Sequence, residues 1–136
     1  MLVAMDASQA IADLTEISPQ VKDVVASGAD GAVIGSNVGD DAAQRLLDGA
    51  RRLLDAAEAL RPGVAQIEAA TTTGSVFVVR DGERLIAATT TPEPTVGLVF
   101  YDLKTCLRSI DEEPAAPKPK RKRAPAKKKE TEDAAS

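Results

Sequence analysis

Apolar residues recur at helical spacing in three stretches of this chain, residues 7–17, 40–60 and 96–110. Asp6 precedes the first stretch in the position of an N-cap. Thr95 stands in the same position before the third stretch. Each stretch is long enough for several turns and begins at a capping residue or an acidic pair, so the pattern predicts three helices.

The middle helix has the most regular pattern. Small and large apolar residues alternate along it at spacings of three and four, and Leu47 and Leu54 widen the apolar face beyond this seam. The seam consists of Ala43, Leu46, Ala50, Leu53, Ala57 and Leu60. Asp40 and Asp41 place negative charge at the positive end of the helix dipole, and Pro62-Gly63 ends the run.

Shorter stretches in the second half of the chain have the pattern of strands. Residues 64–69 alternate between two faces. Residues 75–80 and 83–89 flank Asp81-Gly82, which is a strong signal for a two-residue hairpin loop. Residues 76–79 are apolar on both faces, which predicts a central strand covered on both sides.

Residues 18–28 fit either of two structures. Ser-Pro at the start and Gly28 at the end would suit a helix. The β-branched valines of the segment, followed by Ala29-Asp30-Gly31, favour a hairpin, and we prefer strand, turn, strand. The order is then α-β-β-α-β-β-β-α, which predicts an α/β (α+β) three-layer sandwich: a five-stranded, mostly antiparallel sheet with helices on both faces.

Charge divides the chain into two parts. Residues 1–113 contain 9 Lys/Arg and 18 Asp/Glu, a net of −9, whereas residues 114–136 contain 8 Lys/Arg and 3 Asp/Glu, a net of +5; together they give the −4 of the whole chain. We place one folded domain at residues 1–112 and a basic tail rich in Lys, Pro and Ala at residues 113–136. Prolines and the lack of an apolar period predict that this tail is disordered.

The tail has the composition of a segment that attaches to polyanions. Its basic residues are Lys118, Lys120, Arg121, Lys122, Arg123, Lys127, Lys128 and Lys129. They would bind nucleic acid, an anionic membrane or an acidic protein in a salt-dependent and sequence-independent way. A solubilising extension that binds nothing is the other interpretation of the same residues.

The composition removes most catalytic chemistry. The chain has no histidine and a single cysteine, Cys106, which excludes His-based nucleophilic catalysis and Cys/His metal sites. Phosphate-binding glycine motifs are absent. The acidic pairs Asp40-Asp41 and Glu112-Glu113 fit helix ends better than a catalytic dyad. We therefore predict no catalytic residue, no metal, no cofactor and no small-molecule substrate. The lone cysteine, together with the lack of an apolar stretch of membrane-spanning length, predicts a cytoplasmic protein.

The order of elements and five local patterns resemble the roadblock (dynein light-chain) family over residues 7–110. The patterns are Asp30-Gly31 in the first hairpin, the long second helix, Gly74-Ser75-Val76-Phe77-Val78-Val79, Asp81-Gly82-Glu83-Arg84-Leu85-Ile86, and Gly97-Leu98-Val99 at the start of the last helix. The chain departs from the family in the loop before Gly97. Members often have small residues with Asn there, whereas this chain has Pro92-Glu93-Pro94-Thr95.

The resemblance implies a homodimer or heterodimer in which the second helices pair and a strand extends the sheet across the interface. The interface residues would be Ala43, Leu46, Leu47, Ala50, Leu53, Leu54 and Ala57, although the same helix could simply pack on its own sheet. Bacterial and archaeal members are associated with small Ras-like GTPases as regulators or scaffolds. A noncatalytic GTPase regulator is thus the leading hypothesis. The alternative is a polyanion-binding protein whose dimeric body links two basic tails and gains avidity.

Overall fold

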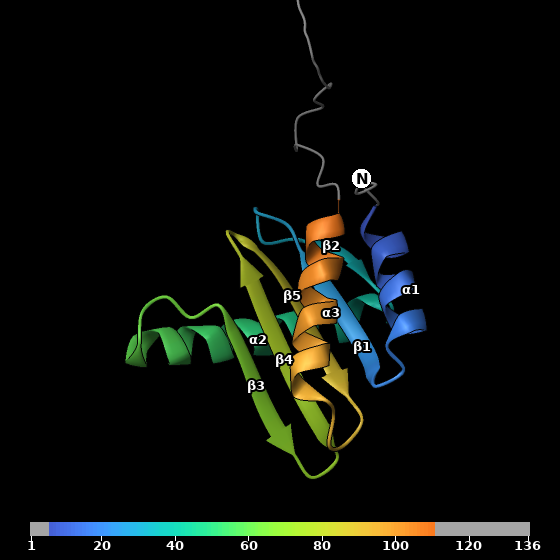
Figure 1. The fold of residues 1–136 in the computed structure, drawn as a ribbon. Helices are drawn as coiled ribbons and strands as arrows, with labels where there is room; N and C mark the ends of the chain where they lie inside the picture. The colour runs from blue at the N-terminus through green and yellow to red at the C-terminus, as the bar shows by residue number, and fades with distance from the viewer. Residues whose placement is uncertain (1–5, 111–136) are drawn as a thin grey trace, which may run out of the picture.

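The computed structural model describes residues 6–110, which form three helices and five strands in the expected order (Figure 1). The elements are α1 Ala7–Ile17, β1 Val21–Ser27, β2 Val33–Ser36, α2 Asp40–Leu60, β3 Gln66–Thr71, β4 Gly74–Asp81, β5 Arg84–Thr90 and α3 Val96–Ser109. The hairpin interpretation of residues 18–28 is confirmed. The predicted basic tail, with all its lysines and arginines, lies outside the described residues.

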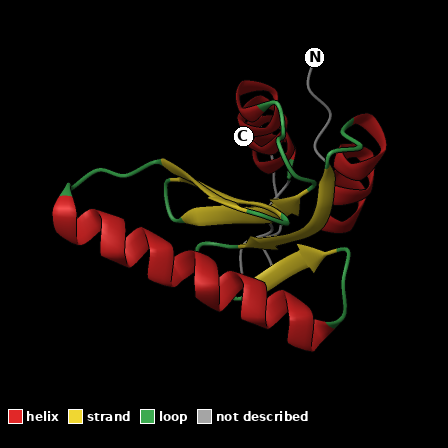
Figure 2. Ribbon diagram, turned by 90° about the horizontal axis from the view of Figure 1, so that it is seen from below, coloured by secondary structure: helices red, strands yellow, loops and turns green. Residues whose placement is uncertain are grey.

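The strands form one antiparallel sheet in the order β2-β1-β5-β4-β3. Helices α1 and α3 cover one face of this sheet and α2 crosses the other (Figure 2). The predicted three-layer α+β sandwich is therefore confirmed. The central strand is β5, and β4 is the interior strand beside it, covered on both faces as its sequence predicts.

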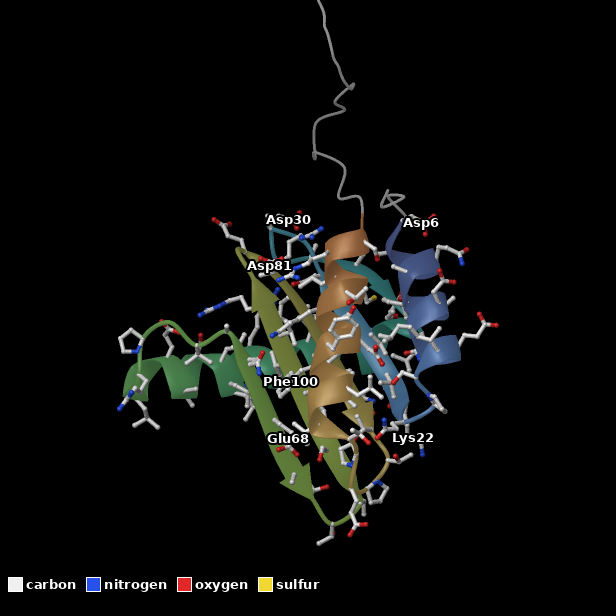
Figure 3. The ribbon with its side chains drawn as sticks, in the orientation of Figure 1. Asp6, Lys22, Asp30, Glu68, Asp81 and Phe100 are labelled. Carbon is white, nitrogen blue, oxygen red and sulfur yellow. The ribbon has the colours of Figure 1, made fainter. Side chains whose placement is uncertain are left out.

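Each face of the sheet has its own hydrophobic core. On the α1/α3 side, Phe77 of β4 is fully buried, and its ring meets that of Phe100 edge to face at 4.9 Å between centroids (Figure 3 labels Phe100). On the α2 side, Val78 and Ala87 of neighbouring strands belong to one buried cluster with Leu47 of α2. Successive residues of β4 alternate between the two cores, which is why its sequence is apolar throughout.

Two local details differ from the sequence predictions. Asp81 pairs with Arg84, so the loop of the last hairpin is Gly82-Glu83, one residue later than expected. Gly82 has φ +65, which suits the first loop position of the turns that match strand twist. Asp6 caps α1 by accepting a hydrogen bond from the Gln9 amide at 2.8 Å, but the Gln9 side chain bonds Asp13 instead of returning to the cap.

Cys106 of α3 is buried at the α1/α3 side of the core. Burial, with a smaller contribution from the charge of Asp13, raises the pKa of its thiol to about 12. Because the thiolate is the reactive form, we expect negligible reaction with Ellman's reagent at mildly alkaline pH in the folded protein. One thiol per chain should react in concentrated guanidinium. Rapid reaction of the folded protein would contradict this placement.

Candidate interaction surface

Helix α2 has two neighbouring apolar stripes, and the structure separates them. Four of the predicted interface residues are buried against the chain's own sheet: Ala43, Leu47, Ala50 and Leu54. Leu47 and Leu54, expected to lie beyond the core seam, are thus part of the core itself. Two other predicted interface residues, Leu46 and Leu53, pack against the core yet stay partly exposed.

The second stripe is the part of α2 that its own sheet leaves uncovered. We call it the apolar flank; it consists of Ala42, Leu46, Gly49, Leu53, Ala56, Ala57 and Leu60. These residues are half-buried or exposed, and Leu60 at the end of the helix is 85% exposed. Their spacing repeats every three or four residues, so they form a continuous line on one side of the helix. Sequence reasoning missed Ala42, Gly49 and Ala56 because they lie outside the seam that it followed from Ala43 to Leu60.

Strand β3 is an edge strand next to this flank. Only β4 pairs with it among the described residues, so its other edge presents unpaired backbone groups. Ile67 and Ala69 pair with Val78 and Val76, face the α2 side of the sheet and are half-buried. The C-terminal end of α2 extends past β3 (Figures 1 and 2). An open strand edge and an uncovered helix flank therefore lie on the same side of the molecule.

The loop between α2 and β3 is fixed by one carboxylate. Glu58 accepts hydrogen bonds from the amides of Gly63 at 2.8 Å and Val64 at 3.2 Å. The Arg80 guanidinium of β4 bonds Glu58 at 3.0 Å and also the Val64 carbonyl. The pKa of Glu58 is held below its ordinary value of 4.5, most strongly by the Gly63 amide and next by Arg80 and the Val64 amide. This network holds α2 and β3 in one fixed relation.

Replacing Glu58 by glutamine should destabilise the fold at neutral pH, since two amides and a guanidinium lose their carboxylate. A carboxylate with a lowered folded pKa contributes stability above the unfolded pKa and loses it as the pH falls through the folded value. The difference in urea midpoint between wild type and E58Q should therefore be largest at neutral pH and should shrink as the pH falls below 4.5. A difference that is constant with pH would contradict this role of Glu58.

Within residues 6–110, no cluster of three or more His, Cys, Asp or Glu side chains could hold a metal ion. No helix in this range is long and apolar enough to cross a membrane. Helix α2 also carries three arginines, of which Arg45 and Arg52 are exposed. Arg51 instead bonds the Gly31 carbonyl of the β1–β2 turn.

Solved structures share this arrangement. A Roadblock/LC7 domain from Streptomyces avermitilis superimposes with a TM-score of 0.66 at 18% identity, covering 77% of this chain and 94% of that one. The chain has the roadblock fold. MglB from Myxococcus xanthus matches with a TM-score of 0.58 at 14% identity, over 76% of this chain and 83% of the other. The gliding protein MglB from Thermus thermophilus matches with a TM-score of 0.59 at 14% identity, over 80% and 92%.

The comparisons with sequences give no match: neither a family model nor a curated protein matches the chain. The roadblock fold is thus retained here at identities of 14–18% to the three structures above. Alternating strands and amphipathic helices can keep the same cores with different apolar residues. This explains why the element order and the turn motifs, rather than overall identity, carried the resemblance in the sequence.

Proposed function

We propose that the chain is a noncatalytic, dimeric regulator or scaffold of a small Ras-like GTPase. The observation that carries the proposal is the roadblock fold with an uncovered α2 flank beside an open β3 edge. The resemblance to bacterial roadblock proteins supplies the class of partner. Its surface, and no reactive group, would then determine its effect on the GTPase. A cytoplasmic location is part of the same proposal.

The proposed dimer joins two copies through the same two features. A second β3 along the open edge would satisfy the unpaired backbone groups and extend the sheet. A second α2 beside the first would cover the apolar flank, where Gly49 and Ala56 allow close approach of the two helices. Both contacts are self-complementary, as a two-fold interface requires. The proposed interface residues are Leu46, Leu53, Ala57 and Leu60, together with Ile67 of β3.

Association with a GTPase is tested by pull-down with purified Ras-like GTPases, beginning with any encoded next to this gene. Each GTPase is loaded with GDP or with a nonhydrolysable GTP analogue. We expect one of them to bind the full chain with a preference for one nucleotide state. The same binding should persist in a variant ending at residue 112. A stable dimer that binds no GTPase in either state would reject the proposal.

The charge division of the sequence favours a second candidate, in which the basic tail attaches the dimer to a polyanion. Two linked tails would bind more tightly than one. DNA or anionic-vesicle binding would then fall steeply with added salt and disappear without residues 113–136. GTPase binding that survives the same truncation supports the first proposal. Comparing the full chain with the truncated chain therefore distinguishes the two proposed functions.

A further inference from the structure

A pocket of about 580 Å³ opens between α2 and the turns at one end of the sheet. Its walls come from the β1–β2 turn, from α2, and from β4 and the β4–β5 turn. Asp30, one of its lining residues, and nearby Asp81 mark this end of the sheet in Figure 3. The volume lies within the range of ordinary small-ligand sites, about 300–1,000 Å³.

The side chain of a largely buried serine lines this pocket. Ser27 of β1 lines it, and the residue is only 1% exposed. Ser27 pairs with Leu85, which belongs to the core on the α2 side, so its side chain faces the α2 layer. No other group within residues 6–110 forms a hydrogen bond with its Oγ, so the hydroxyl is available to a ligand. A polar group of a ligand would satisfy it.

Two half-buried arginines provide further donors around this hydroxyl. Arg51 uses Nη2 to bond the Gly31 carbonyl, and Arg80 uses Nη2 to bond Glu58 and Val64. These contacts restrain both guanidinium groups. The Nε and Nη1 donors of both side chains have no partner in the described part of the chain. Arg51, Arg80 and Ser27 line the same pocket, and all three carry hydrogen-bond donors of the kind that bind an oxyanion.

The outer part of the pocket has the opposite charge. Its lining includes the carboxylates of Asp30, Asp55 and Glu83, and all three residues are exposed. None of them forms an ion pair within residues 6–110. The less exposed walls are thus cationic and the rim is anionic. A polyphosphate would be repelled by this rim, and a simple cation by the two guanidinium groups.

We propose that this pocket binds a small zwitterion of the amino-acid class. Its carboxylate contacts Ser27 Oγ and the guanidinium groups of Arg51 and Arg80, and its ammonium group contacts the carboxylates of Asp55 and Glu83. The pocket stays open in the proposed dimer, because Arg51 and Asp55 lie two residues from Leu53 and so on the opposite side of the helix. A bound amino acid would hold the β1–β2 turn against α2.

The test is isothermal titration calorimetry of the full chain with each common L-amino acid, and with acetate and methylammonium as separate halves of the zwitterion. We expect at least one amino acid to bind with a Kd below about 1 mM. Each half alone should bind at least about tenfold more weakly. Equal binding of acetate would mean a simple anion site, equal binding of methylammonium a cation site, and no binding at all an empty pocket; each of these results rejects the proposal.

Single substitutions in the pocket test where the amino acid binds. Ser27→Ala removes only a hydroxyl that has no partner within residues 6–110. It should therefore leave the midpoint of thermal unfolding unchanged while raising the Kd for the amino acid about tenfold. Arg51→Gln should weaken binding at least as much, whereas Arg52→Gln, on the exposed side of the same helix, should leave it unchanged. Binding that is unaffected by Ser27→Ala, or reduced equally by Arg52→Gln, would overturn the assignment. The result does not depend on finding a GTPase partner.

Discussion

Replacing Leu53 by aspartate is expected to convert the proposed dimer into a monomer. Leu53 lies in the apolar flank of α2, half-buried in one chain and facing the place where a second α2 would pack. A carboxylate there would be desolvated without a partner in the dimer but hydrated in the monomer. A residue at the centre of an interface contributes about 2 kcal/mol or more to the free energy of association. The dissociation constant of the dimer should therefore rise at least about 30-fold. Light scattering across a concentration series measures this.

Because Leu53 also touches the core, a second pair of variants separates dimer loss from unfolding. Leu60 is 85% exposed, so Leu60→Asp removes little packing within one chain. Ala59 is its exposed neighbour and lies outside the apolar flank. We expect Leu60→Asp to weaken the dimer and Ala59→Asp to leave it intact, with similar far-ultraviolet circular dichroism for both. A soluble Leu53→Asp protein that is still dimeric at low concentration would reject this interface.

The second large effect is expected from Gly74→Ala at the start of β4. Gly74 has φ +149, and a Cβ built there would lie 2.1 Å from the Thr90 carbonyl oxygen in the neighbouring strand. Neither backbone can move without breaking the β4–β5 pairing. Strain of this kind costs about 1–3 kcal/mol for the backbone alone, and the steric clash adds to it. We expect a loss of about 3 kcal/mol or more in the free energy of unfolding, measured by urea titration.

The matched control is Gly97→Ala in the first turn of α3. A Cβ at Gly97 would meet no atom within 4 Å, and its φ is not in the left-handed region. The same chemical change should therefore be neutral or stabilise the protein by about 0.5 kcal/mol through helix propensity. Equal urea midpoints for Gly74→Ala and the wild type would contradict the close approach of β4 and β5.

Among the candidate sites, the sequence singled out α2 as the proposed interaction helix but did not show which of its sides the sheet leaves uncovered. The apolar arc of α2 is wide enough for two stripes, and both follow the 3.6-residue period. Which stripe is buried depends on where the sheet lies, and that is a long-range property. The pocket near Ser27 was not foreseen at all, because a single serine in an apolar strand gives no signal until two turns and a helix close around it.

The sequence by itself determined the order and kind of the elements, because periodicity, caps and Asp-Gly turns act within a few residues. It also determined that charge separates the body from the tail and that histidine chemistry is missing. Only the tertiary structure decided that β5 is the central strand, that Leu47 and Leu54 are core residues, and that Arg51 contacts the β1–β2 turn. These facts arise from contacts between segments distant in the sequence, whose pairing no local pattern specifies.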